Sequence, residues 1–181
     1  MTTRFCKACF APLKMNSLHA FLYRDLCLCD KCLASLDPKL IHTKIDGVKG
    51  ICLYLYRDTV KEKIYTLKGC GDIELAQIFL NYYQHELRHK YRGYIILPAP
   101  SDEEANQKRG FNHVQEIFKV LNCPIYPLIQ KKEAFKQSDL SKSERAKIKD
   151  KLFIKDIDKL RHKKVLFVDD ILTTGSTLKA C

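Results

Sequence analysis

One stretch near the end of the chain constrains the fold more than any other: an apolar run that ends in two carboxylates and turns into a hydroxyl-rich segment. It reads Val165-Leu-Phe-Val-Asp169-Asp170-Ile-Leu-Thr-Thr-Gly-Ser-Thr177. A short apolar run bounded by turn residues predicts a buried strand, and the residues after the glycine predict the start of a helix. Ligands of open α/β sheets bind just beyond the carboxyl ends of such strands. We therefore expect an α/β fold with a binding site at residues 169–177.

The residue types in this turn suit a phosphorylated ribose. Backbone N–H groups at a helix start bind anions, and Gly175 lets the chain approach a phosphate closely. Asp169 and Asp170 stand where vicinal ribose hydroxyls need acceptors and where hydrated Mg²⁺ can be held. A Walker loop is excluded, because Gly-Lys-Ser/Thr is absent and the acidic pair precedes the turn. The alternative is an Asp-rich turn with an incidental Thr-Thr-Gly. The further hydroxyl donors are Thr173, Thr174, Ser176 and Thr177.

The N-terminal region carries two Cys-x2-Cys pairs, Cys6/Cys9 and Cys29/Cys32, separated by 19 residues. This spacing is typical of a four-cysteine zinc ribbon. Four thiolates leave no open coordination position, so the predicted zinc is structural rather than catalytic. A segment of roughly 40 residues has too little core to fold unaided, so the metal supplies much of its folding energy. Cys27 is an alternative ligand to Cys29. The alternative to a zinc site is that these cysteines bind no metal.

Between these two regions the chain alternates strand-like and helix-like runs. We expect strands at residues 48–56, 94–97, 124–129 and 165–168, and such alternation predicts a parallel sheet with covered faces. Expected helices span residues 58–67 and 72–87, and a third begins at the cap residue Asn112. Cys52, Cys70 and Cys123 are interpreted as small buried residues. The predicted core faces consist of Val60, Ile64, Leu67, Ile73, Ala76, Leu80, Tyr83, Leu87, Val114, Ile117, Phe118 and Leu121.

Composition limits the compartment and the partners. No apolar stretch approaches the roughly 20 residues that span a bilayer, and the N-terminus shows no signal sequence, so we expect a cytoplasmic protein without membrane insertion. The nine cysteines are then unlikely to form disulfides, because that compartment keeps thiols reduced. The net charge is +11, and residues 131–164 hold 13 basic and 6 acidic side chains. Such a segment attracts polyanions, although a solvated surface explains it equally well.

Three segments together resemble a known family. Residues 165–177 look like the phosphoribosyl pyrophosphate (PRPP) loop of type I phosphoribosyltransferases. Pro98-Ala-Pro-Ser101 followed by Arg109-Gly-Phe-Asn112 is similar to the pyrophosphate-side loop and first core helix of the ComF family of DNA-uptake proteins, where Arg109 would pair with pyrophosphate. Gln137-Ser-Asp-Leu-Ser141 with Glu144-Arg145 resembles the flexible loop of that family, which continues toward Phe153. Salvage enzymes of this fold generally lack the four-cysteine ribbon, so the combination favours ComF.

The resemblance implies an organisation and three competing functions. Residues 1–40 would form a double zinc ribbon-like domain, and residues 45–181 a phosphoribosyltransferase-like domain that stops soon after the PRPP loop. ComF proteins serve natural transformation, which implies association with single-stranded DNA and a competence helicase. The second hypothesis is an active phosphoribosyltransferase with Mg²⁺, in which Asp169 and Asp170 are the catalytic pair; the third is a binding module that has lost catalysis. No acceptor substrate is indicated, and the early stop at Cys181 suggests a truncated chain.

Overall fold

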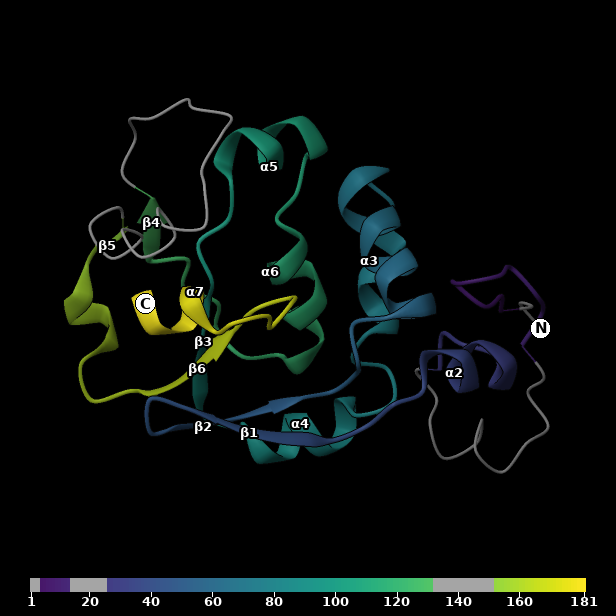
Figure 1. Ribbon diagram of the computed structural model, residues 1–181, viewed down its shortest axis with the longest axis horizontal. Coiled ribbons are helices and arrows are strands. Elements are labelled where there is room, and N and C mark those ends of the chain that lie inside the picture. The colour runs from purple at the N-terminus through teal and green to yellow at the C-terminus, as the bar shows by residue number, and fades with distance from the viewer. Residues whose placement is uncertain (1–3, 14–25, 132–151) are drawn as a thin grey trace.

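The computed structural model describes residues 4–13, 26–131 and 152–181. Figure 1 shows the arrangement, with the cysteine-rich N-terminal region at one end of an elongated molecule and the mixed helices and strands beside it. The helices, including the short 3₁₀ turns η1, η2 and η4, are α2 Asp30–Leu36, α3 Asp58–Gly69, η1 Ile73–Ile78, α4 Gln84–Lys90, α5 Glu103–Arg109, α6 His113–Phe118, η2 Lys119–Leu121, η4 Ile157–Leu160 and α7 Ser176–Ala180. The strands are β1 Ile41–Ile45, β2 Val48–Cys52, β3 Tyr94–Pro98, β4 Ile129–Lys131, β5 Leu152–Ile154 and β6 Lys164–Val168.

The centre of the fold is a pair of parallel strands. β3 and β6 pair from Tyr94 with Lys164 to Pro98 with Val168. Both were expected as buried strands, and the parallel pairing is confirmed. β3 is largely buried, whereas β6 is only partly buried, with Lys164 and Val165 exposed. Ile125 extends the arrangement by one parallel bridge to Ile96. The strand predicted at residues 124–129 is therefore confirmed only at this bridge and at Ile129, where β4 begins, and Pro127 between them has no N–H to donate to a ladder.

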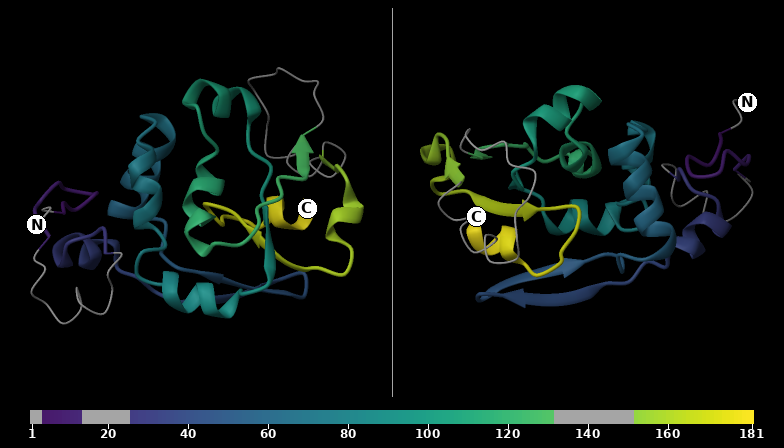
Figure 2. Two further views of the ribbon diagram at one scale, coloured as in Figure 1. Left: turned by 180° about the vertical axis from the view of Figure 1, so that it is seen from behind. Right: turned by 45° about the horizontal axis from the view of Figure 1, so that its top comes forward.

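The strand expected at residues 48–56 is shorter and is paired differently. β2 forms an antiparallel hairpin with β1, a strand that the sequence analysis did not anticipate. Asp46 and Gly47 join the two strands, with φ angles of 48° and 84°. Positive φ at both turn positions matches the right-handed twist of a two-residue hairpin, and Asp-Gly is a favoured sequence for it. The hairpin is an elongated arm along one side of the molecule, with α7 beside it (Figure 2).

The expected helix at residues 58–67 is confirmed as α3, with Val60, Ile64 and Leu67 buried. The long helix expected at residues 72–87 is wrong. The chain instead forms the 3₁₀ helix η1, a turn and then α4. Leu75 and Ile78 stand three residues apart and are both buried, which suits the three-residue period of a 3₁₀ turn, whereas Ile73 is exposed.

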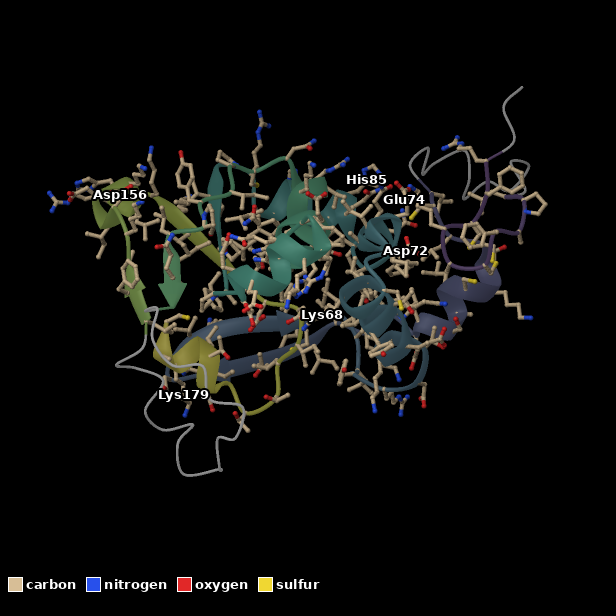
Figure 3. All side chains as sticks on the ribbon, turned by 90° about the horizontal axis from the view of Figure 1, so that it is seen from above. Lys68, Asp72, Glu74, His85, Asp156 and Lys179 are labelled. Carbon is tan, nitrogen blue, oxygen red and sulfur yellow. The ribbon has the colours of Figure 1, made fainter. Side chains whose placement is uncertain are left out.

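The hydrophobic core joins the cysteine-rich region to the rest of the chain. Cys6, Cys27 and Leu36 belong to the same cluster of buried side chains as Leu67 of α3 and Ile78 of η1. Lys7 also pairs with Glu74 at the start of η1, which lies next to the N-terminal region in Figure 3. Cys52 and Cys123 are only partly buried and Cys70 is exposed, so the expectation that all three are buried is wrong. The resemblance to the flexible loop at residues 137–145 lies outside the described residues.

Candidate functional site

The carboxyl ends of β3 and β6 lie side by side. Pro98 pairs with Val168, and the N–H of Ala99 donates to the carbonyl of Val168 at 2.8 Å. The two loops that leave the strands, one toward Ser101 and the other through Asp169 and Asp170, therefore start from the same edge of the sheet. This is the place where ligands bind in open α/β sheets. We call it the carboxyl edge.

The loop after β3 is fixed by its own polar side chains. Asn106 and Asn112 each donate a side-chain N–H to the hydroxyl of Ser101, at 2.6 and 2.8 Å. Gly110 ends α5 at a φ of 83°, and Asn112 caps α6 by accepting from the N–H groups of Val114 and Gln115. The cap predicted at Asn112 is thus confirmed. These bonds position Arg109 and His113 at the ends of two consecutive helices.

Four side chains from separate elements close a hydrogen-bonded ring at the carboxyl edge. The Asp170 Oδ2 atom accepts from Lys68 Nζ of α3 at 2.8 Å, and it lies 3.0 Å from His113 Nε2 of α6. Arg109 Nη1 lies 3.0 Å from His113 Nδ1, and Arg109 Nε donates to the carbonyl of Lys68 at 2.9 Å. The side chains of Asp170 and His113 are 9% and 8% exposed. Lys68 lies at the centre of the molecule in Figure 3.

This geometry assigns the hydrogen on the His113 ring. Arg109 has no acceptor, so His113 Nδ1 accepts from the guanidinium, and Nε2 donates to the carboxylate of Asp170. The neutral ring satisfies both contacts without carrying a charge. His113 therefore links Arg109 to the acidic pair, and Lys68 supplies the cation that the buried carboxylate requires.

The two carboxyl groups of the acidic pair are electrostatically unequal. Burial, and then the hydrogen bond and charge of Asp170, raise the pKa of Asp169 to about 7. Burial acts in the same direction on Asp170, but hydrogen bonds from His113 and Lys68 outweigh it and hold the pKa of that carboxyl well below its usual range. At neutral pH the pair therefore holds between one and two negative charges, with the shared proton on Asp169.

The turn after the acidic pair requires its glycine. Gly175 has a φ of 73°, and a Cβ atom there would lie 2.9 Å from Cδ1 of Ile45 in β1. The hydroxyls of Thr174 and Ser176 are 2.6 Å apart. Lys179 of α7 pairs with Asp46 in the hairpin turn at 3.4 Å. The hairpin that sequence analysis missed is therefore the surface against which this turn packs.

A separate site lies in the N-terminal region, where the four predicted ligands Cys6, Cys9, Cys29 and Cys32 converge. Their Sγ atoms all lie within 4.8 Å of one another, and the Sγ atoms of Cys9 and Cys29 are 3.7 Å apart. Zinc bound to four thiolates at about 2.3 Å places neighbouring sulfurs about 3.8 Å apart. The cluster thus has the donor set and the spacing of a structural zinc site.

Cys27, the alternative ligand to Cys29, lies outside this cluster. Its side chain is buried in the hydrophobic core. Ligands of one zinc ion must converge on a single point, and Cys27 is not among the thiols that do so. The structure therefore assigns the fourth ligand position to Cys29 and a packing role to Cys27.

The site residues predicted from the sequence lie at these two centres. Asp169, Asp170 and Arg109 lie at the carboxyl edge, with Arg109 joined to the pair through His113. The turn of Thr173, Thr174, Gly175, Ser176 and Thr177 follows directly on the acidic pair. Sequence analysis missed Lys68 and His113. The signal available for His113 was its place on the buried face of α6, four residues before Ile117.

Comparison with known proteins finds two relatives that match most of this chain. The chain is 28% identical to the competence protein ComFC of Streptococcus pneumoniae (strain ATCC BAA-255 / R6) over an alignment of 189 residues, which covers 92% of this chain and 84% of that protein. It is 29% identical to the competence protein ComFC of Bacillus subtilis (strain 168) over 181 residues, covering 98% of this chain and 70% of that protein. Over most of its length the chain is thus similar to two ComFC competence proteins. No family model matches it.

In the described part of the chain, no helix is long and apolar enough to cross a membrane.

Proposed function

We propose that this ComF-family chain acts in DNA uptake and binds PRPP at its carboxyl edge, through a phosphoribosyltransferase-like domain at residues 45–181. Two relatives that are competence proteins support the role in uptake. The observation that carries the ligand proposal is the acidic pair held by Lys68 and His113 where β3 and β6 end side by side. It supplies fixed acceptors next to a glycine turn rich in hydroxyls, which is what a phosphorylated ribose requires.

Each part of the ligand has a counterpart among the residues of this edge. The carboxyl groups of Asp169 and Asp170 accept the ribose hydroxyls. Hydroxyls and backbone N–H groups of residues 173–177 receive the 5′-phosphate, and Arg109 faces the pyrophosphate. Because Asp169 holds a proton near neutral pH, the pair repels this highly anionic ligand less than two full charges would. Mg²⁺, when bound with PRPP, would neutralise the pyrophosphate, and the carboxylates are oxygen ligands of the kind it prefers.

The cysteine cluster serves the fold rather than the chemistry. Four thiolates complete a tetrahedral zinc shell, so the metal would hold residues 1–40 as a structural domain. We expect one zinc per chain in protein purified without chelator, released by a thiol-modifying reagent, with loss of cooperative unfolding. Protein that contains no zinc but still unfolds cooperatively would contradict this assignment.

An active phosphoribosyltransferase of nucleotide metabolism is the second candidate function. The specific observation in its favour is the acidic pair, whose fixed carboxyls suit the positioning of a ribose ring while a nucleophile attacks it. An enzyme would consume PRPP in the presence of an acceptor base and lose that activity in Asp170→Asn. A binding module, or an uptake factor that uses PRPP as a ligand, would bind PRPP without consuming it.

The first test is a thermal-shift titration with PRPP and Mg²⁺. A ligand that binds only the folded state raises the melting temperature in a saturable manner. We expect that rise for the native chain and its loss in Asp170→Asn, while Asp158→Asn, a change of the same charge at an exposed position, keeps it. A chain that melts cooperatively without any shift would overturn the ligand proposal. Binding of single-stranded DNA and of a competence helicase is tested by pull-down with and without PRPP.

A further inference from the structure

Parallel pairing of β3 and β6 also brings together the residues that precede the two strands. Tyr94 pairs with Lys164 at the start of both strands. The sequence before β3 is His89-Lys90-Tyr91-Arg92, and the sequence that enters β6 is Arg161-His162-Lys163-Lys164. Two basic tetrapeptides that begin 72 residues apart in the chain therefore lie at one end of the same strand pair. This end is opposite the carboxyl edge, as the course of both strands in Figure 1 shows.

The cations of this region are exposed and lack carboxylate partners. Lys90, Arg92, Lys163 and Lys164 are all exposed, and no carboxylate of the described residues forms an ion pair with any of them. Residues 86–94 and 155–164 together hold eight Lys or Arg and three Asp or Glu side chains. Such an excess at one place on the surface attracts a polyanion rather than a single small anion.

Two tyrosine rings lie among these cations. The Lys90 ammonium lies 5.7 Å from the centre of the Tyr91 ring, and the Lys164 ammonium lies 5.9 Å from the centre of the Tyr94 ring. The two rings meet edge to face, with their centres 5.4 Å apart. Both side chains are only partly buried. An arrangement of cations interleaved with aromatic rings is the recognition chemistry of single-stranded nucleic acids, in which phosphates meet cations and bases stack on rings.

We propose that Lys90, Tyr91, Arg92, Tyr94, Lys163 and Lys164, the amino-edge patch, bind the backbone and bases of a single-stranded nucleic acid. This inference deepens the proposed role in DNA uptake by locating the contact on the end of the strand pair away from PRPP. An anionic membrane is the competing partner, since Ile157 and Val165 are also exposed nearby. The patch favours nucleic acid because, apart from Lys90 at the end of α4, its residues lie at strand starts and in turns. Proteins that insert into a membrane interface usually do so through one face of an amphipathic helix.

The test measures binding of a fluorescent 20-nucleotide oligothymidylate by anisotropy at several salt concentrations. The test variant replaces Lys90, Arg92, Lys163 and Lys164 by Ala. The matched control replaces four exposed lysines elsewhere, Lys31, Lys44, Lys49 and Lys61, and so makes the same change in net charge. We expect at least tenfold weaker binding for the test variant at about 0.1 M salt, and a salt dependence lower by about two to three logarithmic slope units. The control should lose less than threefold.

Two further ligands separate the partners. An abasic oligonucleotide of equal length should bind several-fold more weakly than oligothymidylate if bases stack on Tyr91 and Tyr94. Vesicles with 30% phosphatidylserine test the membrane. Equal losses in test and control variants, or a loss confined to vesicle binding, would overturn the proposal, and so would a native chain that binds no oligonucleotide.

The PRPP thermal shift keeps this inference separate from the proposed ligand site. The test variant should retain the full shift, because its substitutions lie at the other end of the strands. A shift that persists while oligonucleotide binding is unaffected would overturn the amino-edge patch and leave the PRPP proposal standing. Loss of both would overturn the placement of DNA away from PRPP. Should the four-residue variant fail to melt cooperatively, Lys163→Gln with Lys164→Gln provides the same comparison with two exposed substitutions.

Discussion

The two ends of the β3–β6 pair hold their charges in opposite ways. At the carboxyl edge the carboxylate of Asp170 is buried and hydrogen-bonded: it is bonded to Lys68 and His113, and its side chain is 9% exposed. At the amino edge, Lys90, Lys163 and Lys164 are exposed and have no carboxylate partner among the described residues. The first arrangement fixes the position of a few atoms, whereas the second leaves mobile cations on the surface.

This difference indicates which kind of ligand suits each end of the β3–β6 pair. A small ligand with hydroxyls and phosphates at set distances needs acceptors that do not move, and a ring of hydrogen bonds provides them. A flexible polyanion needs charge and stacking area more than exact placement. Two strands of five residues thus separate the two binding modes that we propose. The separation predicts that substitutions at the carboxyl edge change both stability and PRPP binding, and that those at the amino edge change only binding.

The largest effect is expected from Asp170→Asn. The substitution removes the charge that faces Lys68 and His113, and removing one partner of a buried pair costs about 3–5 kcal/mol. We expect the lower end of that range, because the Lys68 side chain is 38% exposed. Urea unfolding measures the loss, with Asp169→Asn as the matched control. Because the carboxyl of Asp169 is already about half protonated at pH 7 and faces no cation of the described part of the chain at hydrogen-bond distance, its variant should be closer to the native chain. Equal losses in both variants would show that the pair is not asymmetric.

A smaller effect is expected from Gly175→Ala. The new Cβ would meet Ile45 at 2.9 Å, and φ is positive, so strain of about 1–3 kcal/mol is expected together with weaker PRPP binding. Gly47→Ala is the control: its φ is also positive, but no atom lies within 4 Å of the new Cβ. The difference between the two variants, measured by urea unfolding, isolates the contact with β1. A Gly47 variant as damaged as the Gly175 variant would mean that backbone strain alone explains the requirement.

The pH dependence of stability tests the acidic pair without a ligand. Asp169 has a folded pKa of about 7 against an ordinary value of 3.8. Between these values the folded state binds more protons than the unfolded state, so the free energy of unfolding falls as pH rises, by at most about 4 kcal/mol. Below pH 3.8 the lowered pKa of Asp170 acts in the opposite direction, and stability falls as pH falls. We expect Asp169→Asn to remove the decline between pH 4 and pH 7 in urea titrations. A variant that keeps the full decline would place the proton elsewhere.

Local patterns predicted much of the fold because they depend on residues close in the sequence. The strands before Pro98 and Asp169, the buried face of α3, the cap at Asn112 and the four cysteines all follow from such patterns. The hairpin was also local, and Asp46-Gly47 is a sequence signal for it that was overlooked, because a strand running from residue 48 to 56 was expected instead. The prediction of one α-helix at residues 72–87 was wrong because apolar residues at spacings of three and four suit an α-helix and a 3₁₀ turn almost equally.

Contacts between distant residues set the limit of prediction at the site. Asp170 and the glycine turn were expected from one continuous motif. The partners of Asp170 lie 102 and 57 residues away in the sequence, so no periodicity links them. Only the fold shows that Lys68 in the last turn of α3 and His113 at the start of α6 meet at the end of β6. The amino-edge patch was equally unpredictable from the sequence, since neither basic tetrapeptide indicates that the other lies beside it.

The last prediction compares a lysine at each end of the strand pair, Lys164 and Lys68, and the smallest effect on stability is expected for Lys164. Lys164→Met should change the free energy of unfolding by no more than about 0.5 kcal/mol, because the ammonium is exposed and loses only its contact with the Tyr94 ring. Lys68→Met should cost more, since it leaves the carboxylate of Asp170 with His113 alone. Three quantities are measured on the same samples of both variants: urea unfolding, the rise in melting temperature with PRPP, and oligonucleotide binding. The two variants should show opposite patterns of loss in the two binding measurements. Lys68→Met should lower stability and the PRPP shift, and Lys164→Met only oligonucleotide binding. If both lysines affect both ligands, the two ends of the strand pair act as one site.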